Sequence, residues 1–146
     1  MLKELRHCGI VVSNMERSLK FYRDLLGLKI IREMDESGKY IDNMLKLEKV
    51  RVKTVKLSVN NGNSLIELLE FKSHQNNNVK RNIFDQGVSH VAFTVENLDQ
   101  VYNNLRKENI KFNAPPQLSQ DGYAKVTFCY DPDNTPIELV QVLQST

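Results

Sequence analysis

The chain has 146 residues, which is enough for one compact domain or for two small modules that share a sheet, and too few for two independent domains. Apolar residues make up 40% and charged residues 26%, as in ordinary soluble globular proteins, and the formal charge of +2 comes from scattered lysines and arginines. This composition excludes a strongly basic nucleic-acid surface, a bilayer-spanning run and a signal-peptide core, so we expect a cytoplasmic protein with no nucleic-acid and no membrane partner.

The first half of the chain predicts a strand, a helix and three further strands. Ser13 and Asn14 offer a cap for the helix, and Gly27 ends it. The polar connection 34–49 holds a short helix near 41–47, and a connection of this length often covers a site. In chain order, we expect a strand over 5–12, a helix over 15–26, and strands over 28–33, 50–59 and 64–71.

The second half predicts the same order of elements. We expect a strand over 88–95, a helix over 97–109, a short strand over 110–113, and strands over 123–130 and 137–143. The segment 73–84 is rich in Asn and Lys and is the expected linker. The sequence therefore predicts a single domain over 1–146, in which module one (1–72) and module two (85–146) are each β-α-β-β-β.

Histidine and glutamate recur at equivalent places in the two halves. His7 opens the first strand of module one and His90 that of module two, and each module closes with an Ile-Glu-Leu strand that contains Glu67 or Glu138. Any one of these residues, taken alone, is most often an ordinary surface or core residue. Two imidazoles and two carboxylates at matching positions instead indicate one shared metal site.

Side chains alternate across a strand, so the four residues can be assigned to a face. Each of them falls opposite the apolar side chains that suit packing under a helix, towards the concave side of a curved sheet. A glutamate between large aliphatic residues is costly to bury without a cation, which a metal ion supplies. Glu70 has the opposite parity and is expected to be solvated, whereas Cys8 and Cys129 are expected to be buried reduced thiols.

Five segments carry a resemblance to a known family: His7-Cys-Gly-Ile-Val-Val, Ser18-Leu-Lys-Phe-Tyr-Arg-Asp-Leu-Leu-Gly-Leu, Ile66-Glu-Leu-Leu-Glu, Gly87-Val-Ser-His-Val-Ala-Phe-Thr-Val and Asp131-Pro-Asp-Asn-Thr-Pro-Ile-Glu-Leu-Val. With them the whole chain resembles the vicinal oxygen chelate superfamily, which includes glyoxalase I, methylmalonyl-CoA epimerase, extradiol dioxygenases and the fosfomycin and bleomycin resistance proteins. The resemblance implies an α+β fold of two paired β-α-β-β-β modules that form a curved, cup-shaped mixed sheet with helices on the outside. It also implies metal ligands at His7, Glu67, His90 and Glu138.

Two positions depart from the family pattern. The epimerase branch typically has two adjacent histidines where this chain has Ser89 and His90. Asn134 replaces the glycine usual in the Asp-Pro-Asp-Gly turn, and Asn also tolerates a left-handed backbone. No segment marks a glutathione or coenzyme A pocket, which leaves the substrate open.

The expected function is that of a metal-dependent lyase or isomerase of the glyoxalase or epimerase type. Two imidazoles and two carboxylates suit Zn, Ni, Co, Mn or Fe, and six-coordination leaves two places for adjacent oxygens of a small-molecule substrate. A proton next to the metal-bound carbonyl is then removed through an enediolate. Glu138 is the preferred base and Glu67 the alternative, in a protein expected to form a homodimer.

Two other functions stay open. An iron-dependent ring-cleaving dioxygenase needs two histidines and one carboxylate, and a second carboxylate occupies a place that oxygen or substrate would want. A metal-free small-molecule binding protein that sequesters a drug needs none of the four ligand residues, although all four are present. Metal content separates these classes.

Overall fold

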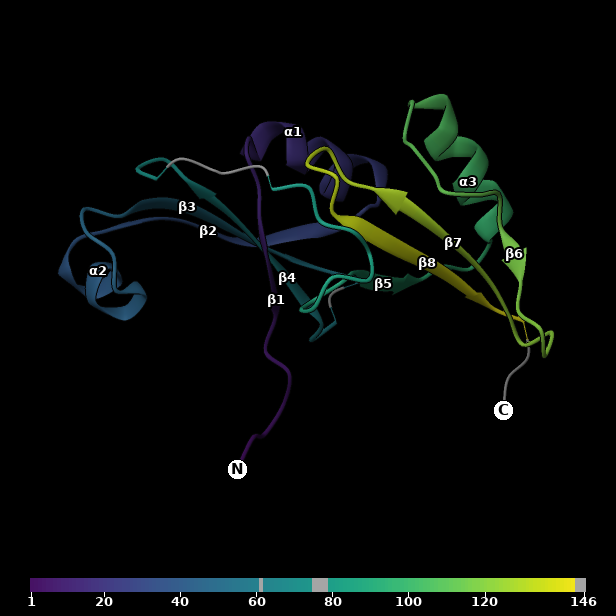
Figure 1. The fold of residues 1–146 in the computed structure, drawn as a ribbon, viewed down its shortest axis with the longest axis horizontal. Coiled ribbons are helices and arrows are strands. Elements are labelled where there is room, and N and C mark those ends of the chain that lie inside the picture. The colour runs from purple at the N-terminus through teal and green to yellow at the C-terminus, as the bar shows by residue number, and fades with distance from the viewer. Residues whose placement is uncertain (61, 75–78, 144–146) are drawn as a thin grey trace. The chain divides into compact units, whose positions relative to one another are not determined.

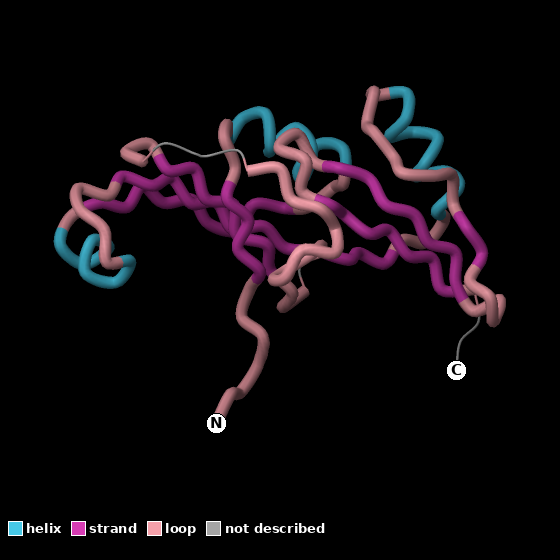
Figure 2. The backbone as a smooth tube through the Cα atoms, in the orientation of Figure 1, coloured by secondary structure: helices cyan, strands magenta, loops and turns pink. Residues whose placement is uncertain are grey.

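Each half of the chain folds into a four-stranded mixed sheet with helices beside it (Figures 1 and 2). The structure, a computed structural model, describes residues 1–60, 62–74 and 79–143. It divides into two compact units, Met1–Val79 and Lys80–Thr146. Residues 75–78 of the expected linker and Asn61 of the expected hairpin turn lie outside the described residues. The predicted α+β class is confirmed.

The described residues of the first unit form these elements in chain order: β1 (Cys8–Val11), α1 (Met15–Leu19), η1 (Lys20–Leu25), β2 (Lys29–Ser37), α2 (Lys39–Leu45), β3 (Arg51–Ser58) and β4 (Leu65–Phe71). Its strands lie in the order β1-β4-β3-β2, with β1 parallel to β4 and the other pairs antiparallel. The helix predicted over 15–26 is present as one continuous helical segment, in which α1 passes directly into the π-helical η1.

The second unit repeats this plan with β5 (Val91–Thr94), α3 (Leu98–Lys107), β6 (Gln117–Leu118), β7 (Ala124–Tyr130) and β8 (Pro136–Val142). The strand order β5-β8-β7-β6 matches that of the first unit, again with one parallel pair. The short strand predicted over 110–113 is wrong. There Phe112 makes only an isolated bridge to Cys129, and Pro115 and Pro116 lack the N–H that a ladder needs, so β6 starts after them.

Different helices pack on the two faces of the first sheet. Ile10, Val55 and Leu68 are nearly fully buried on the face that α1 covers, together with Leu19 and Tyr22 of the helical segment. Burying such side chains contributes about 1.5–3 kcal/mol each, so this layer is the core of the unit.

The opposite face of this sheet is covered by α2. Ile41 of α2 packs with Val50 and Val52, and Leu69 and Phe71 of β4 lie against this cluster. Leu69 and Phe71 alternate with the α1-facing residues of β4, which places α2 on the face that Glu67 also occupies. The connection that the sequence expected to cover a site therefore lies over this face.

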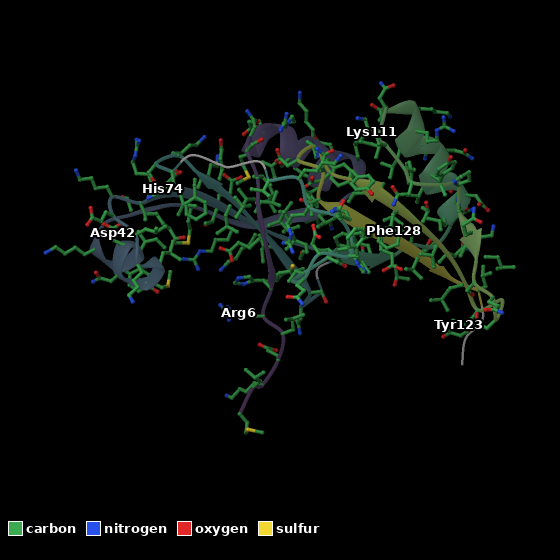
Figure 3. All side chains as sticks on the ribbon, viewed as in Figure 1. Arg6, Asp42, His74, Lys111, Tyr123 and Phe128 are labelled. Atoms are coloured by element: carbon green, nitrogen blue, oxygen red, sulfur yellow. The ribbon has the colours of Figure 1, made fainter. Side chains whose placement is uncertain are left out.

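The connection from α2 to β3 is stabilised by hydrogen bonds to one carboxylate. Asp42, labelled in Figure 3, accepts hydrogen bonds from Val50 N at 2.8 Å and Lys49 N at 3.1 Å. These bonds satisfy backbone donors at the turn and hold α2 in place over the sheet.

The first turns of α1 and α3 are capped in the same way in the two units. Asn14 caps α1 by accepting from Arg17 N at 2.9 Å, and Asn97 caps α3 by accepting from Gln100 N at 3.0 Å. The first cap confirms the sequence prediction, and the cap side chain satisfies a backbone donor that the helix itself cannot pair.

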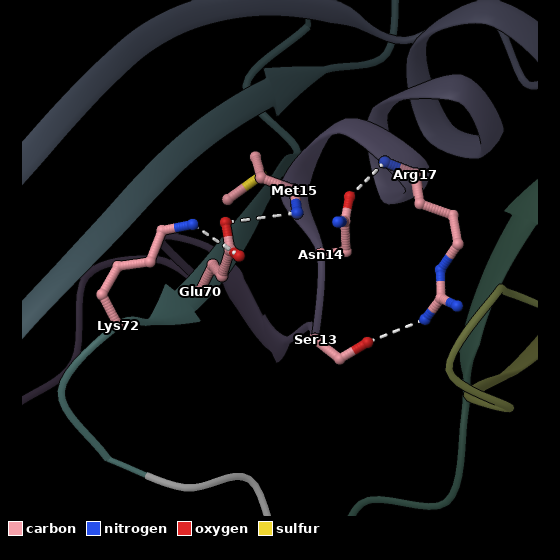
Figure 4. A network of polar contacts seen from close by, with 6 residues as sticks. All are labelled: Ser13, Asn14, Met15, Arg17, Glu70 and Lys72. Atoms are coloured by element: carbon pink, nitrogen blue, oxygen red, sulfur yellow. Dashed lines mark hydrogen bonds and ion pairs between the residues drawn. The ribbon is translucent and has the colours of Figure 1, made fainter.

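A second acceptor for each helix start comes from the last strand of the same unit. Glu70 Oε2 accepts from Met15 N at 3.2 Å and pairs with Lys72 Nζ at 2.6 Å (Figure 4), while Gln141 Oε1 accepts from Leu98 N at 2.9 Å. Glu70 is only 8% exposed, so the expectation of a solvated Glu70 is wrong. Because side chains alternate along β4, Glu70 points to the face that α1 covers, at the point where α1 begins.

The two cysteines are free thiols, as expected, but they differ in environment. Cys129 is fully buried, and desolvation raises its thiol pKa to about 12, with the Asp131 carboxylate adding to the rise. Cys8 is only partly buried, so the expectation of a buried thiol is confirmed for Cys129 and wrong for Cys8. In the part of the chain that the structure describes, no helix combines the length and apolar character that crossing a membrane requires.

Candidate metal centre

The first histidine and glutamate lie side by side in the first unit. His7 precedes β1, and Glu67 occupies the middle of β4, opposite Gly9 of β1 in the parallel register. His7 Nε2 is 2.6 Å from Glu67 Oε2, and the side chains are 29% and 12% exposed. Because Ile66 and Leu68 on either side of Glu67 are buried on the other face, strand parity alone brings the pair together.

The second unit holds an equivalent pair. His90 precedes β5, and Glu138 lies in β8 opposite Ala92. His90 Nε2 is 3.0 Å from Glu138 Oε2, and the side chains are 34% and 22% exposed. Both pairs thus use the same atoms, and the second is longer and more open.

The two imidazoles differ at their other nitrogen. Ser89 Oγ lies 2.5 Å from His90 Nδ1, whereas His7 Nδ1 is buried and has no hydrogen-bond partner among the described residues. When His90 Nδ1 carries the proton and donates to Ser89 Oγ, the lone pair of Nε2 faces Glu138. The sequence identified Ser89 only as a departure from a pattern, and no sequence signal marked it as a partner of His90.

The two His–Glu pairs also differ in the residue that lies opposite the glutamate on the neighbouring antiparallel strand. Lys56 of β3 is opposite Glu67, and Phe128 of β7 is opposite Glu138. The ring of Phe128, labelled in Figure 3, stands edge-on to that of His90 with 5.2 Å between their centroids. The first pair therefore has a cation next to it, and the second an aromatic ring.

The donor types of each pair suit a metal ion. His90 Nε2 and Glu138 Oε2, at 3.0 Å, are as far apart as adjacent ligands around an octahedral ion with bonds of about 2.1 Å, whereas His7 Nε2 and Glu67 Oε2, at 2.6 Å, are at hydrogen-bond distance. Imidazole nitrogen and carboxylate oxygen also suit divalent transition metals. In the described part of its own unit, neither pair is joined by a third His, Cys, Asp or Glu, so one pair alone supplies two ligands.

The sequence and fold match known proteins over nearly the whole chain. A family model described as Glyoxalase/Bleomycin resistance protein/Dioxygenase superfamily matches residues 4–139. YwkD, an uncharacterized protein of Bacillus subtilis, is 32% identical over 97% of this chain and 98% of its own length. A probable lactoylglutathione lyase of Synechocystis is 28% identical over 94% of each chain. The crystal structure of a glyoxalase family protein from Bacillus cereus shares the fold, with a TM-score of 0.87 at 20% identity over 99% of this chain and 97% of that chain.

Proposed function

The chain belongs to the Glyoxalase/Bleomycin resistance protein/Dioxygenase superfamily, and from this premise we propose that it is a metal-dependent lyase or isomerase of the glyoxalase type. The observation that carries the proposal is the pair of His–Glu contacts at equivalent places in the repeat, each of which brings an imidazole nitrogen beside a carboxylate oxygen. The relative from Synechocystis that is named a probable lactoylglutathione lyase supports the same reaction class.

The proposed ligands are His7 and His90 through Nε2, and Glu67 and Glu138 through a carboxylate oxygen. Each pair supplies two ligands, so four-ligand binding of one ion requires both pairs, brought together within one chain or in a homodimer. A bound Zn, Ni, Co, Mn or Fe ion would polarise a substrate carbonyl and make the hydrogen on the neighbouring carbon acidic.

Glu138 is the proposed base, because its side chain is more accessible to a substrate than that of Glu67 and its contact with histidine is longer. Its side chain is 22% exposed against 12% for Glu67, and its contact with histidine is 3.0 Å against 2.6 Å. A carboxylate oxygen of Glu138 takes the proton from the substrate carbon and later returns it to the same or the adjacent carbon. Glu67 is the alternative base on the equivalent strand.

The test compares Glu138→Gln with the matched variant Glu67→Gln in the metal-loaded protein. An amide oxygen still coordinates but cannot accept the proton, so Glu138→Gln should slow exchange of the substrate's α-hydrogen with heavy water by about a hundredfold to ten-thousandfold. Exchange is measured on a glutathione hemithioacetal and on methylmalonyl-CoA.

Each possible result bears on a different part of the proposal. Retained metal with lost exchange in Glu138→Gln, and a smaller loss in Glu67→Gln, is the expected pattern. The reverse pattern assigns the base to Glu67. If the unaltered protein binds metal yet exchanges no α-hydrogen of any α-hydroxy carbonyl or thioester substrate, the lyase and isomerase assignment is wrong.

A further inference from the structure

Two cations lie in line with Glu67 on the α2-covered face of the first sheet. In the register of the sheet, Lys56 of β3 is opposite Glu67 of β4, and Arg32 of β2 is opposite Lys56. Side chains directly opposite in an antiparallel pair point to the same face, so Glu67, Lys56 and Arg32 form one row across three strands. With strands about 4.8 Å apart, the two cations start about 5 and about 10 Å from the Glu67 backbone.

A break in the strand register creates this row. The register of β2 against β3 shifts between Ile30 and Arg32, so Ile31 has no opposite partner and Arg32 comes to face Lys56. Such irregularities re-aim a side chain, and they are common next to active sites.

The pairing of Arg32 with Lys56 is unfavourable for folding, because like charges directly opposite in a sheet destabilise it. Opposite charges are paired elsewhere in the sheet: Asp35 is opposite Lys53, and Glu67 is opposite Lys56. In residues 1–60, 62–74 and 79–143, neither Lys56 nor Arg32 has an ion-pair partner, and Glu67 is in contact with His7 instead. Glu67 is the carboxylate nearest to the two cations in this row, and because it is in contact with His7 it forms no ion pair with either of them. Two adjacent cations that share no ion pair are better explained by a ligand than by the stability of the sheet.

The next rows of the same face are closed to water by α2. Thr54 is opposite Leu69 and is 4% exposed, and Val52 is opposite Phe71 and is 3% exposed beneath Ile41. The row with the cations is therefore the more open part of the face, since Lys56 is half-buried and Arg32 exposed. In the second unit Phe128 takes the place that Lys56 has here, so this feature belongs to the first unit.

We propose that Lys56 and Arg32 bind an oxyanion, a carboxylate or a phosphate group, on the substrate of the His–Glu site. This inference rests on the proposed function and narrows its substrate to a small carbonyl compound that carries an anionic group. Arg32 offers a planar fork that matches an oxyanion, and Lys56 offers a charge nearer to Glu67.

The test titrates the metal-loaded protein with inorganic phosphate and with malonate by calorimetry, which separates the two oxyanion sources. Lys56→Gln and Arg32→Gln should each weaken binding of the preferred anion by about tenfold or more. Lys53→Gln is the matched control, because Lys53 lies on the same strand but on the other face, and it should bind as the unaltered protein does.

Unfolding midpoints and metal content of the same variants distinguish the possible failures. Arg32→Gln should unfold at the same or a higher urea concentration, because it removes only the like-charge contact with Lys56. Both Arg32→Gln and Lys56→Gln should keep the metal stoichiometry. Equal anion affinity in all variants, an equal loss in Lys53→Gln, or no anion binding at all would overturn the inference. A protein that holds no metal but still binds anions through Lys56 and Arg32 would instead count against the proposed function.

Discussion

Replacing Glu70 by alanine should destabilise the first unit by about 2 kcal/mol. The Glu70 carboxylate accepts the backbone N–H of Met15, a residue that is 2% exposed, so the substitution leaves this donor without its acceptor. Loss of the acceptor at a helix start costs about 1 kcal/mol, and a buried donor left unpaired costs about 1–3 kcal/mol. Both costs refer to the same N–H group of Met15, so they are not added together. The ion pair with Lys72 contributes little, because the Lys72 side chain is 52% exposed.

Urea unfolding followed by circular dichroism measures this free energy. Glu70→Gln keeps an acceptor, as Gln141 does in the second unit, and should lose about 1 kcal/mol or less. Lys72→Met removes only the exposed partner and should lose still less. If Glu70→Ala cost no more than Lys72→Met, the ion pair rather than the helix start would be the role of Glu70, and the capping argument would be refuted.

Three further outcomes follow from local geometry. Ser89→Ala should weaken metal binding by about tenfold to a hundredfold, measured by competition with a chelator, while Ser89→Thr, which keeps the hydroxyl, should retain most of the affinity. The pKa of Cys129 is raised to about 12 in the folded chain, so above about pH 9 unfolding releases the proton of this thiol. The free energy of unfolding, measured by urea titration, should therefore fall as the pH rises from about 9 towards 12. The fall should be shallower in Cys129→Ala. Asn134 has a φ of 64°, so Asn134→Gly should leave the unfolding free energy nearly unchanged whereas Asn134→Val should lower it by about 1–2 kcal/mol.

Periodicity and repetition made the element order predictable from the sequence. The face shared by His7 and Glu67 followed from counting residues along alternating strands, since each lies opposite a continuous apolar set. The turn at Asn134 was predictable because few other residues adopt its left-handed backbone.

The sequence predictions failed, or were not made, where the outcome depends on tertiary packing and on strand register. Glu70 was expected in solvent because it has the opposite parity to Glu67, and parity does not show that β4 ends beneath the start of α1. The available signal was Gln141, which follows Glu138 by three residues as Glu70 follows Glu67. The approach of Arg32 to Lys56 depends on a register shift, which no periodicity reveals.

Metal stoichiometry and affinity of the purified protein test the central claim most directly. The chelator-treated protein is titrated with Zn, Ni, Co, Mn and Fe(II) ions, and the same titration is made on His7→Ala, Glu67→Ala, His90→Ala and Glu138→Ala. One ion per chain, bound more weakly in every one of the four variants, is the predicted result. Absence of binding, or binding that substitutions in only one His–Glu pair weaken, would contradict a single site built from both.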